Sequence, residues 1–235
     1  PGFHVAAWIP GVFGAYLFIA DILAFFVLIG LAYALYRRLF IKPVYLTDSL
    51  DARLIILFTA VIIITFHLIN AFLIIPTIGG TSFDYARYLT ISKVVNNAFN
   101  LDALSGGGSR TGFEICYWIH ILTILGFLVY IPGSKHLHLL AAVPNVFLKP
   151  LDRPKAMRKT DIEDEEAESF GLGNVADLNW KNVLDLYACT ECGRCEERCP
   201  ADMTGKPLSP KRLVHDAKVD LINQAPAILV KDNEE

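Results

Sequence analysis

Four cysteines lie at short, regular intervals near the C-terminal end of the chain: Cys189, Cys192, Cys195 and Cys199. Their spacing is C-x2-C-x2-C-x3-C, and Pro200 follows the last of them. Thiolates at this spacing bind a [4Fe–4S] cluster in bacterial ferredoxins. Gly193 permits a tight turn inside the loop, and Pro200 ends it. The pattern therefore predicts a [4Fe–4S] cluster with these four cysteines as metal ligands.

Two other uses of the cysteines fit less well. Zinc sites usually pair two C-x2-C units across a longer gap, and disulfides across two or three residues close poorly. One alternative stays open inside the cluster hypothesis. In two-cluster ferredoxins the fourth cysteine binds the other cluster, so Cys199 binds either this cluster or a second one. The fifth cysteine, Cys116, lies in an apolar stretch and is expected to be a small buried hydrophobic residue.

Two histidines are candidate haem ligands. His120 lies inside the apolar stretch 113–131, and His138 follows that stretch after Pro132. If the helix ran straight, the two residues would be at most about 27 Å apart. Imidazoles near opposite faces of a membrane suit two b-type haems, each taking one axial ligand. The alternatives are hydrogen-bonded core histidines or, for His138, a residue at the membrane interface.

Other polar residues occur at similar depth in the apolar stretches. His67 and Asn70 share one face of the second stretch, and Asp21 lies in the first. Ionisable residues at such depth are costly and are functional candidates by default. We interpret Asp21 as a quinone contact and His67 as a quinone contact or haem ligand. The alternative is a buried hydrogen-bonded cluster that joins the helices. The remaining histidines are weaker candidates: His136 as a rival haem ligand, His4 at the surface and His215 on a soluble helix.

The composition indicates a membrane protein. Of the 235 residues 54% are hydrophobic and only 19% are charged, with a mean hydropathy of +0.43. The net charge of −3 gives no indication of nucleic-acid binding. Three stretches are long enough to cross a hydrocarbon core of about 30 Å: residues 12–36, 54–75 and 113–131. We therefore expect an all-α membrane protein, with a three-span helical bundle followed by a small α-helical ferredoxin-like module.

Positive charge indicates how these spans are oriented. The segment between the first two spans contains Arg37, Arg38, Lys42 and Arg53, and the segment after the third contains Lys135, Lys149, Arg153, Lys155, Arg158 and Lys159. The segment between the second and third spans contains only Arg87, Lys93 and Arg110. The positive-inside rule places the first two segments in the cytoplasm. We therefore expect a multi-pass protein of the cytoplasmic (inner) membrane whose iron–sulfur module is cytoplasmic.

The expected organisation has three parts. Residues 1–148 form the membrane domain, 149–176 a linker with an acidic run, and 177–235 the iron–sulfur module. Residues 79–112 are expected to be a polar loop, with flexibility at its three consecutive glycines. Helices are expected over 177–187 and from Ser209-Pro210 to about Ile222. The remainder, 224–235, is expected to be weakly structured.

Two segments resemble known families. Trp118-Ile-His120 and Leu128 to His138 resemble the last helix of nitrate reductase gamma subunits, which are dihaem cytochromes b. This resemblance implies that His120 and His138 are axial haem ligands. Tyr187 to Lys211 resembles the iron–sulfur subunit of heterodisulfide reductases. The fusion of these two segments in one chain is similar to the membrane-bound electron-transfer-flavoprotein:menaquinone oxidoreductases.

The resemblance implies a function and shows what this sequence lacks. Such proteins have two further N-terminal spans with the opposite haem ligands, a second cysteine run and cysteine-rich C-terminal domains. We therefore expect these 235 residues to be an internal portion of a longer protein. Electrons would pass from a cytoplasmic partner, implied to be electron-transfer flavoprotein, through the cluster and haems to menaquinone. The expected protein is thus a membrane-bound oxidoreductase of a respiratory chain.

Three alternative functions stay open. One is a thiol/disulfide oxidoreductase of the heterodisulfide reductase type, which would require a cysteine-rich catalytic domain. The second is an anchor subunit that relays electrons inside a larger respiratory complex, which co-purified chains would reveal. The third is a membrane-anchored redox sensor without haem, which an absorption spectrum would separate from the others.

Overall fold

The computed structural model describes residues 10–43, 49–79, 84–104, 107–149 and 173–232. His4, most of the expected linker and four of the basic residues used for the orientation lie outside these ranges. The contacts divide the chain into two compact units, with residues 1–42 and 48–130 in the first and residues 43–47 and 131–235 in the second. The expected domain boundaries at 148 and 176 stay a prediction.

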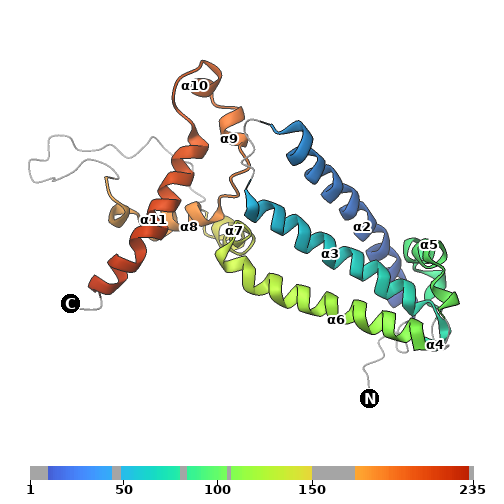
Figure 1. The fold of residues 1–235 in the computed structure, drawn as a ribbon. Coiled ribbons are helices and arrows are strands. Elements are labelled where there is room, and N and C mark those ends of the chain that lie inside the picture. Colours follow the sequence, from blue (N-terminus) through green and yellow to red (C-terminus); the bar gives the residue numbers. More distant parts are fainter. Residues whose placement is uncertain (1–9, 44–48, 80–83, 105–106, 150–172, 233–235) are drawn as a thin grey trace, which may run out of the picture. The chain divides into compact units, whose positions relative to one another are not determined.

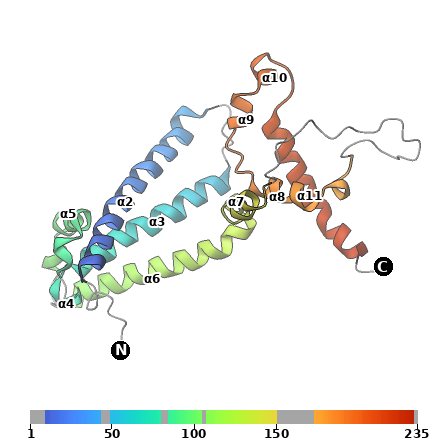
Figure 2. The same ribbon diagram turned by 180° about the vertical axis from the view of Figure 1, so that it is seen from behind.

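Three long helices dominate the first unit. They are α2 (Pro10–Tyr36), α3 (Leu50–Leu73) and α6 (Gly107–Tyr130), and a π-helical turn, η1 (Arg37–Ile41), continues α2. All three are long and apolar enough to cross a membrane, so the expected three-span architecture is confirmed. Helix α3 packs against both α2 and α6, and the three converge near α5 in both ribbon views (Figures 1 and 2).

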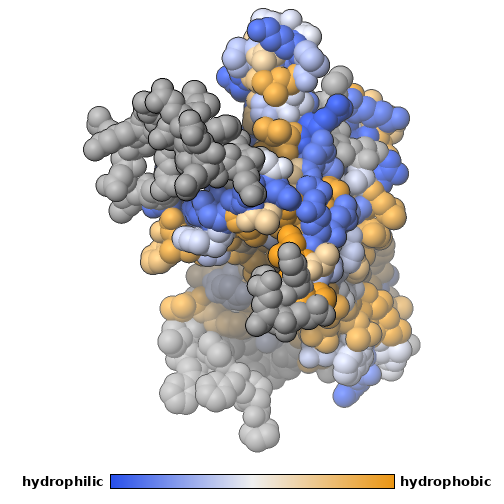
Figure 3. All heavy atoms as spheres, turned by 90° about the vertical axis from the view of Figure 1, so that its left-hand side faces the viewer, coloured by the Kyte–Doolittle hydropathy of each residue, from blue (hydrophilic) through white to orange (hydrophobic). Residues whose placement is uncertain are grey.

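Much of the surface of these helices is hydrophobic. Phe26 on α2, Leu57 on α3 and Val129 on α6 are each more than half exposed. Broad hydrophobic patches are visible at the surface in the space-filling view (Figure 3). Such exposure would be costly in water, but it suits contact with lipid tails or with further apolar helices.

The segment between α3 and α6 is more regular than expected. It contains α4 (Pro76–Gly79), η2 (Tyr85–Arg87), α5 (Thr90–Phe99) and η3 (Leu101–Ala103), and α6 begins at Gly107. The prediction of a polar loop over 79–112 is therefore wrong for most of its described residues. Helix α5 is amphipathic and packs against both α2 and α3. Its polar residue Asn96 is 1% exposed and donates a hydrogen bond to the carbonyl of Ala71 at 3.0 Å.

A small core lies where α3, η3 and α6 meet. The buried side chains Ala71, Phe72, Ile75 and Leu101 form it. Phe113 and Cys116 of α6 pack against this core, so the described position of Cys116 agrees with its interpretation as a small hydrophobic residue.

The second unit is built from shorter helices. It contains η4 (Ile131–Gly133), α7 (Leu137–Phe147), η5 (Val175–Asp177), α8 (Trp180–Ala188), α9 (Arg194–Glu197), α10 (Pro200–Met203) and α11 (Pro210–Asp232). Helix α7 packs against α8, and α11 packs against α8 and η5 around the buried residues Val175, Leu186 and Leu221. Among the described residues of the whole chain there is no strand.

Helix α11 differs from expectation at its C-terminal end. It begins at Pro210, where the hydroxyl of Ser209 accepts a hydrogen bond from the Arg212 amide at 3.1 Å, so the predicted start is confirmed. It continues to Asp232, so the prediction of weak structure from 224 onward is wrong. The helix includes Pro226. Beyond that proline, Ile228 packs against the buried cluster of α8 and α11, which stabilises the last turns.

Candidate functional site

The four-cysteine loop connects α8 to α10. Cys189 is the C-cap of α8, Cys195 lies in α9, and Cys199 is the N-cap of α10. Two residues between the first three cysteines adopt the left-handed region, Glu191 at φ 57° and Gly193 at φ 78°. Left-handed residues reverse the direction of the chain over a short distance. The local sequence therefore folds into a compact turn around the cysteines.

The chemistry of this loop fits an iron–sulfur cluster. All five cysteines of the chain carry free thiols. The Glu191 amide donates a hydrogen bond to Sγ of Cys189 at 3.5 Å, the kind of bond that tunes cluster potentials. Across the described residues, no three His, Cys, Asp or Glu side chains gather closely enough to hold one metal ion. In a cubane each thiolate binds a separate iron, so its ligands stand further apart than those of a single ion.

Charged side chains surround the cysteine loop. Lys135 donates to Oε2 of Glu191 at 2.6 Å, and Glu191 has only 6% of its side chain exposed. On the other side, Glu196 accepts from the Ser209 hydroxyl at 2.7 Å and lies 3.8 Å from Nζ of Lys211. These contacts connect the loop to the segment before α7 and to the start of α11.

His120 is held by α3. Its Nδ1 lies 2.8 Å from the hydroxyl of Thr65, which is buried. That hydroxyl donates its single hydrogen to the carbonyls of Val61 at 2.7 Å and Ile62 at 3.0 Å. With the hydroxyl hydrogen directed to one of these carbonyls, the oxygen accepts from Nδ1 of His120, and this is the tautomer that we infer for the ring. Nε2 then keeps its lone pair, as an axial metal ligand requires.

His138 shows the same arrangement in the second unit. It lies in the first turn of α7, and its Nδ1 lies 2.6 Å from the backbone carbonyl of Lys135. A carbonyl only accepts, so Nδ1 carries the hydrogen and Nε2 keeps its lone pair. His136, the rival ligand, has its ring centroid 5.5 Å from that of His138.

Asp21 links α2 to the start of α5. It is completely buried, and Oδ2 accepts from the Ile91 amide at 2.6 Å. Oδ1 accepts from the Ser92 hydroxyl at 2.6 Å and, more weakly, from its amide at 3.3 Å. Leu89, the N-cap of α5, supplies no side-chain cap, so a carboxylate from another helix caps α5 instead. The hydrogen-bonded cluster considered as an alternative is therefore present.

His67 completes this cluster. Its Nδ1 lies 3.2 Å from Oδ1 of Asp21 and 3.3 Å from the hydroxyl of Ser92. The hydrogen of the hydroxyl goes to Asp21, so Nδ1 of His67 must be the donor. Nε2 of His67 and Nδ2 of Asn70 are the buried side-chain atoms without a hydrogen-bond partner among the described residues. The structure thus brings Asp21 and His67 together and leaves one imidazole nitrogen without a partner.

An apolar groove of about 450 Å³ runs beside His67. Side chains of α2, α3 and α5 line it, and His67 is the lining residue that can form hydrogen bonds: Phe25, Leu28, Ile64, His67, Leu68, Ile91, Val94, Val95 and Phe99. The exposed wall of the groove is apolar, so it suits a flat, apolar ring.

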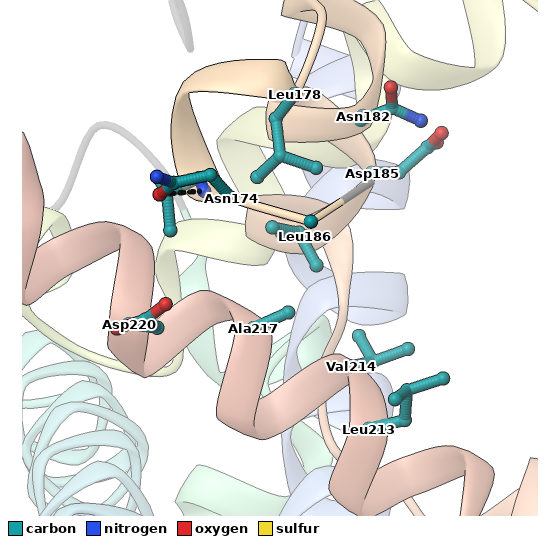
Figure 4. Close-up of a pocket in the computed structure, with 11 residues that line it drawn as sticks. Asn174, Leu178, Asn182, Asp185, Leu186, Leu213, Val214, Ala217 and Asp220 are labelled. Carbon is teal, nitrogen blue, oxygen red and sulfur yellow. Dashed lines mark hydrogen bonds between the residues drawn. The ribbon is translucent and has the colours of Figure 1, made fainter. Parts of the chain in front are cut away.

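A second cavity, of about 470 Å³, lies between η5, α8 and α11 (Figure 4). Leu178, Leu186 and Val214 form apolar parts of its wall, and Asn182 and Asp220 lie at its edges. None of the four cysteines lines it, so it is separate from the cysteine loop. His215, which stands beside Asp216 on α11, is also outside this loop.

Sequence reasoning missed four residues that hold the site together. Thr65, Ser92, Lys135 and Glu191 each contact a candidate ligand or its immediate support. A threonine in an apolar stretch and a serine in a polar segment carry no distinctive pattern. Only Glu191, placed between two cysteines of the motif, could have been singled out from the sequence.

Three apolar helices together with a four-cysteine loop define a class, the helical membrane proteins with an iron–sulfur module. The chain is 37% identical over 217 residues to "Probable iron-sulfur-binding oxidoreductase FadF" of Bacillus subtilis. The matched segment covers 92% of this chain and 30% of that relative. It is also 33% identical over 217 residues to "EtfAB:quinone oxidoreductase" of Syntrophomonas wolfei, and this match covers 90% of the chain and 30% of the relative. The chain belongs to the EtfAB:quinone oxidoreductase-like family of membrane iron–sulfur proteins.

A third relative matches only part of the chain. Over 75 residues the chain is 39% identical to "Probable membrane-anchored ferredoxin" of Chromohalobacter salexigens, which covers 32% of this chain and 11% of the relative. No family model matches the chain, and no solved structure is significantly similar to it. The chain spans about a third of the length of the first two relatives.

Proposed function

We propose that this chain is part of a membrane-bound oxidoreductase that carries electrons between a cytoplasmic redox protein and the quinone pool. One observation carries the proposal. The chain has a four-cysteine loop and also two histidines, His120 and His138, whose Nδ1 atoms lie within hydrogen-bond distance of the Thr65 hydroxyl and the Lys135 carbonyl. In the tautomer that we infer for both, Nε2 keeps the lone pair that a metal ligand needs. The loop and the histidines are both arrangements of residues that bind one-electron carriers.

The protein's own residues hold the carriers and set their surroundings. Cys189, Cys192, Cys195 and Cys199 would bind the [4Fe–4S] cluster, and His120 and His138 would each give one axial ligand to a b-type haem. When bound, these groups supply one-electron steps between the partner and the quinone. Thr65 would hold Nδ1 of His120, and the Lys135 carbonyl would hold Nδ1 of His138. The opposite axial ligands would come from the rest of the longer protein.

The partners follow from the relatives and from charge. The name of the Syntrophomonas relative links EtfAB to a quinone. By analogy, we assign electron-transfer flavoprotein as the donor and a quinone as the acceptor here. The resemblance to electron-transfer-flavoprotein:menaquinone oxidoreductases implies that this quinone is menaquinone. The positive-inside rule supports a cytoplasmic position for the cysteine loop, where a soluble donor can reach it.

The quinone would bind near His67. Its unpartnered, buried Nε2 and the neighbouring apolar groove support this location. Asp21 would act as a positioning residue, because its oxygens are already occupied by Ile91, Ser92 and His67. This assignment keeps Asp21 in the quinone site but removes it from direct contact with the ligand.

The test uses the full-length protein. Pyridine haemochrome analysis should find two b-type haems in the wild type, and His120→Ala and His138→Ala should each lose one of them. Cys192→Ser should lose the electron paramagnetic resonance signal of the dithionite-reduced cluster while keeping both haems. A wild type without haem, or a Cys192→Ser variant with an unchanged signal and normal iron and sulfide content, would refute the assignment.

A further inference from the structure

Lys135 contacts the candidate haem ligand His138 directly and reaches the cysteine loop through Glu191. The backbone carbonyl of Lys135 accepts the Nδ1 hydrogen of His138 at 2.6 Å. The ammonium group of the same lysine donates to Glu191 at 2.6 Å. The Glu191 amide in turn donates to Sγ of Cys189 at 3.5 Å. A continuous chain of contacts therefore connects His138 to the cysteine loop.

The packing of α7 and α8 explains why these groups meet. Lys181, in the first turn of α8, donates to Asn145 near the end of α7. Lys135, just before α7, contacts Glu191, just after α8. Contacts at both ends show that the two helices run antiparallel. The start of α7, which carries His138, therefore lies beside the end of α8, which carries Cys189.

The ion pair is well protected from solvent. Lys135 has 24% of its side chain exposed and Glu191 has 6%. Screening by water is weaker for such a pair than for a surface pair, so each charge acts on its surroundings over several ångströms. Glu191 also adopts a left-handed conformation, which costs a non-glycine residue free energy. The ion pair with Lys135 is one of the contacts that hold it there.

We propose that Lys135 is a positioning residue, which supports His138 through its backbone carbonyl and whose ammonium group, paired with Glu191, offsets the effect of that carboxylate on the reduction potential of the cluster. The inference rests on the proposed function, since it requires both cofactors. Reduction adds negative charge to the cluster, so a nearby cation favours the reduced form and a nearby carboxylate opposes it. In the native pair the two effects largely cancel.

If the two charges offset each other, removing either one from the full-length protein should shift the midpoint potential of the cluster, and the two shifts should have opposite signs. Lys135→Met removes the cation but keeps the Glu191 carboxylate, and should lower the midpoint potential, measured by redox titration of the cluster's electron paramagnetic resonance signal. Glu191→Gln removes the carboxylate but keeps the ammonium group, and should raise it. Each change should alter the reduction equilibrium constant on the order of ten-fold. The double variant should return close to the wild-type potential, and Lys135→Arg should stay there.

Lys181→Met is the matched control, because it removes a lysine from the opposite end of the same helix pair. It should leave the potential unchanged. Both variants must first be shown to keep normal iron, sulfide and haem contents. If their midpoint potentials then shift in the same direction, or if neither potential shifts, the proposal is overturned. Absence of the cluster or of haem from the wild type itself would instead refute the proposed function.

Discussion

At the scale of single residues, the hydrogen bond between Thr65 and His120 gives a sharp test of the haem assignment. Thr65→Val keeps the shape of the side chain but removes the acceptor for Nδ1 of His120. Loss of such a supporting partner typically weakens metal binding by roughly 10- to 100-fold. We expect Thr65→Val to lower the affinity for one of the two haems by this factor, measured by haem titration of the apoprotein.

Thr59 provides the control for this experiment. Its hydroxyl also donates to a carbonyl four residues earlier in α3, that of Ile55, at 2.8 Å, but within the described residues no hydrogen bond joins it to a histidine. Thr59→Val should therefore keep both haems at wild-type affinity. If the two threonine variants behave alike, Thr65 acts only in the packing of α3.

The unpartnered nitrogen of His67 predicts an effect on quinone turnover. His67→Ala removes the hydrogen-bonding side chain that lines the apolar groove. We expect quinone reduction to slow by about ten-fold, the value of one hydrogen bond, with the cluster signal unchanged. Thr59→Val is the control, because the Thr59 hydroxyl bonds to the Ile55 carbonyl within α3 and Thr59 does not line the groove, so quinone reduction should be unchanged. A loss of haem in His67→Ala would mean that His67 is a haem ligand.

At the scale of elements, close packing of α3 against α6 depends on a glycine. A Cβ atom at Gly112 would stand 2.7 Å from the ring of Phe72, which is buried. Gly112→Ala should therefore destabilise the protein by about 1–3 kcal/mol, seen as a lower midpoint of thermal unfolding in detergent. Gly126 lies on the same helix, and a Cβ atom there would meet no described neighbour within 4 Å. Equal stability of Gly112→Ala and Gly126→Ala would contradict this account.

The same elements show what the sequence could and could not reveal. The long apolar runs of α2, α3 and α6 and the Ser209-Pro210 start of α11 are local patterns, so they were predictable. Helix α5 was missed because its cap comes from Asp21, which is distant in sequence. The end of α11 was missed because Ile228 is fixed by tertiary packing. Propensity cannot report such contacts.

In the candidate site, too, local sequence patterns were predictable and tertiary contacts were not. The cysteine spacing is a local signal, and it identified the loop directly. Asp21 and His67 were grouped only because they lie at similar depth in the apolar stretches. The structure joins them through contacts that no spacing rule contains. The support of His120 by Thr65 and the link between Lys135 and Glu191 each connect positions more than fifty residues apart. Those contacts depend on helix packing, which local patterns do not encode.

At the scale of the whole molecule, the distribution of charge predicts which side of the membrane each end of the spans faces. In the first unit, Tyr130 at the end of α6 donates a hydrogen bond to Asp51 at the start of α3. The end of α6 and the start of α3 are therefore at the same face. That face also receives Arg37 and Arg38, which follow α2, and Arg53 in the first turn of α3. The opposite face contains α5 and the start of α6.

The positive-inside rule then predicts that the face with Arg37 and Arg38 is cytoplasmic. Helix α7, with 11 residues, is too short to cross the membrane alone, so the cysteine loop that follows should be on this same side. We expect a membrane-impermeant thiol reagent to label Arg38→Cys of the full-length protein in inverted vesicles, and Asp84→Cys in right-side-out vesicles. Mass spectrometry of the labelled peptides separates these positions from the native cysteines. The reverse labelling pattern would place the cysteine loop on the outer side, out of reach of a cytoplasmic electron donor.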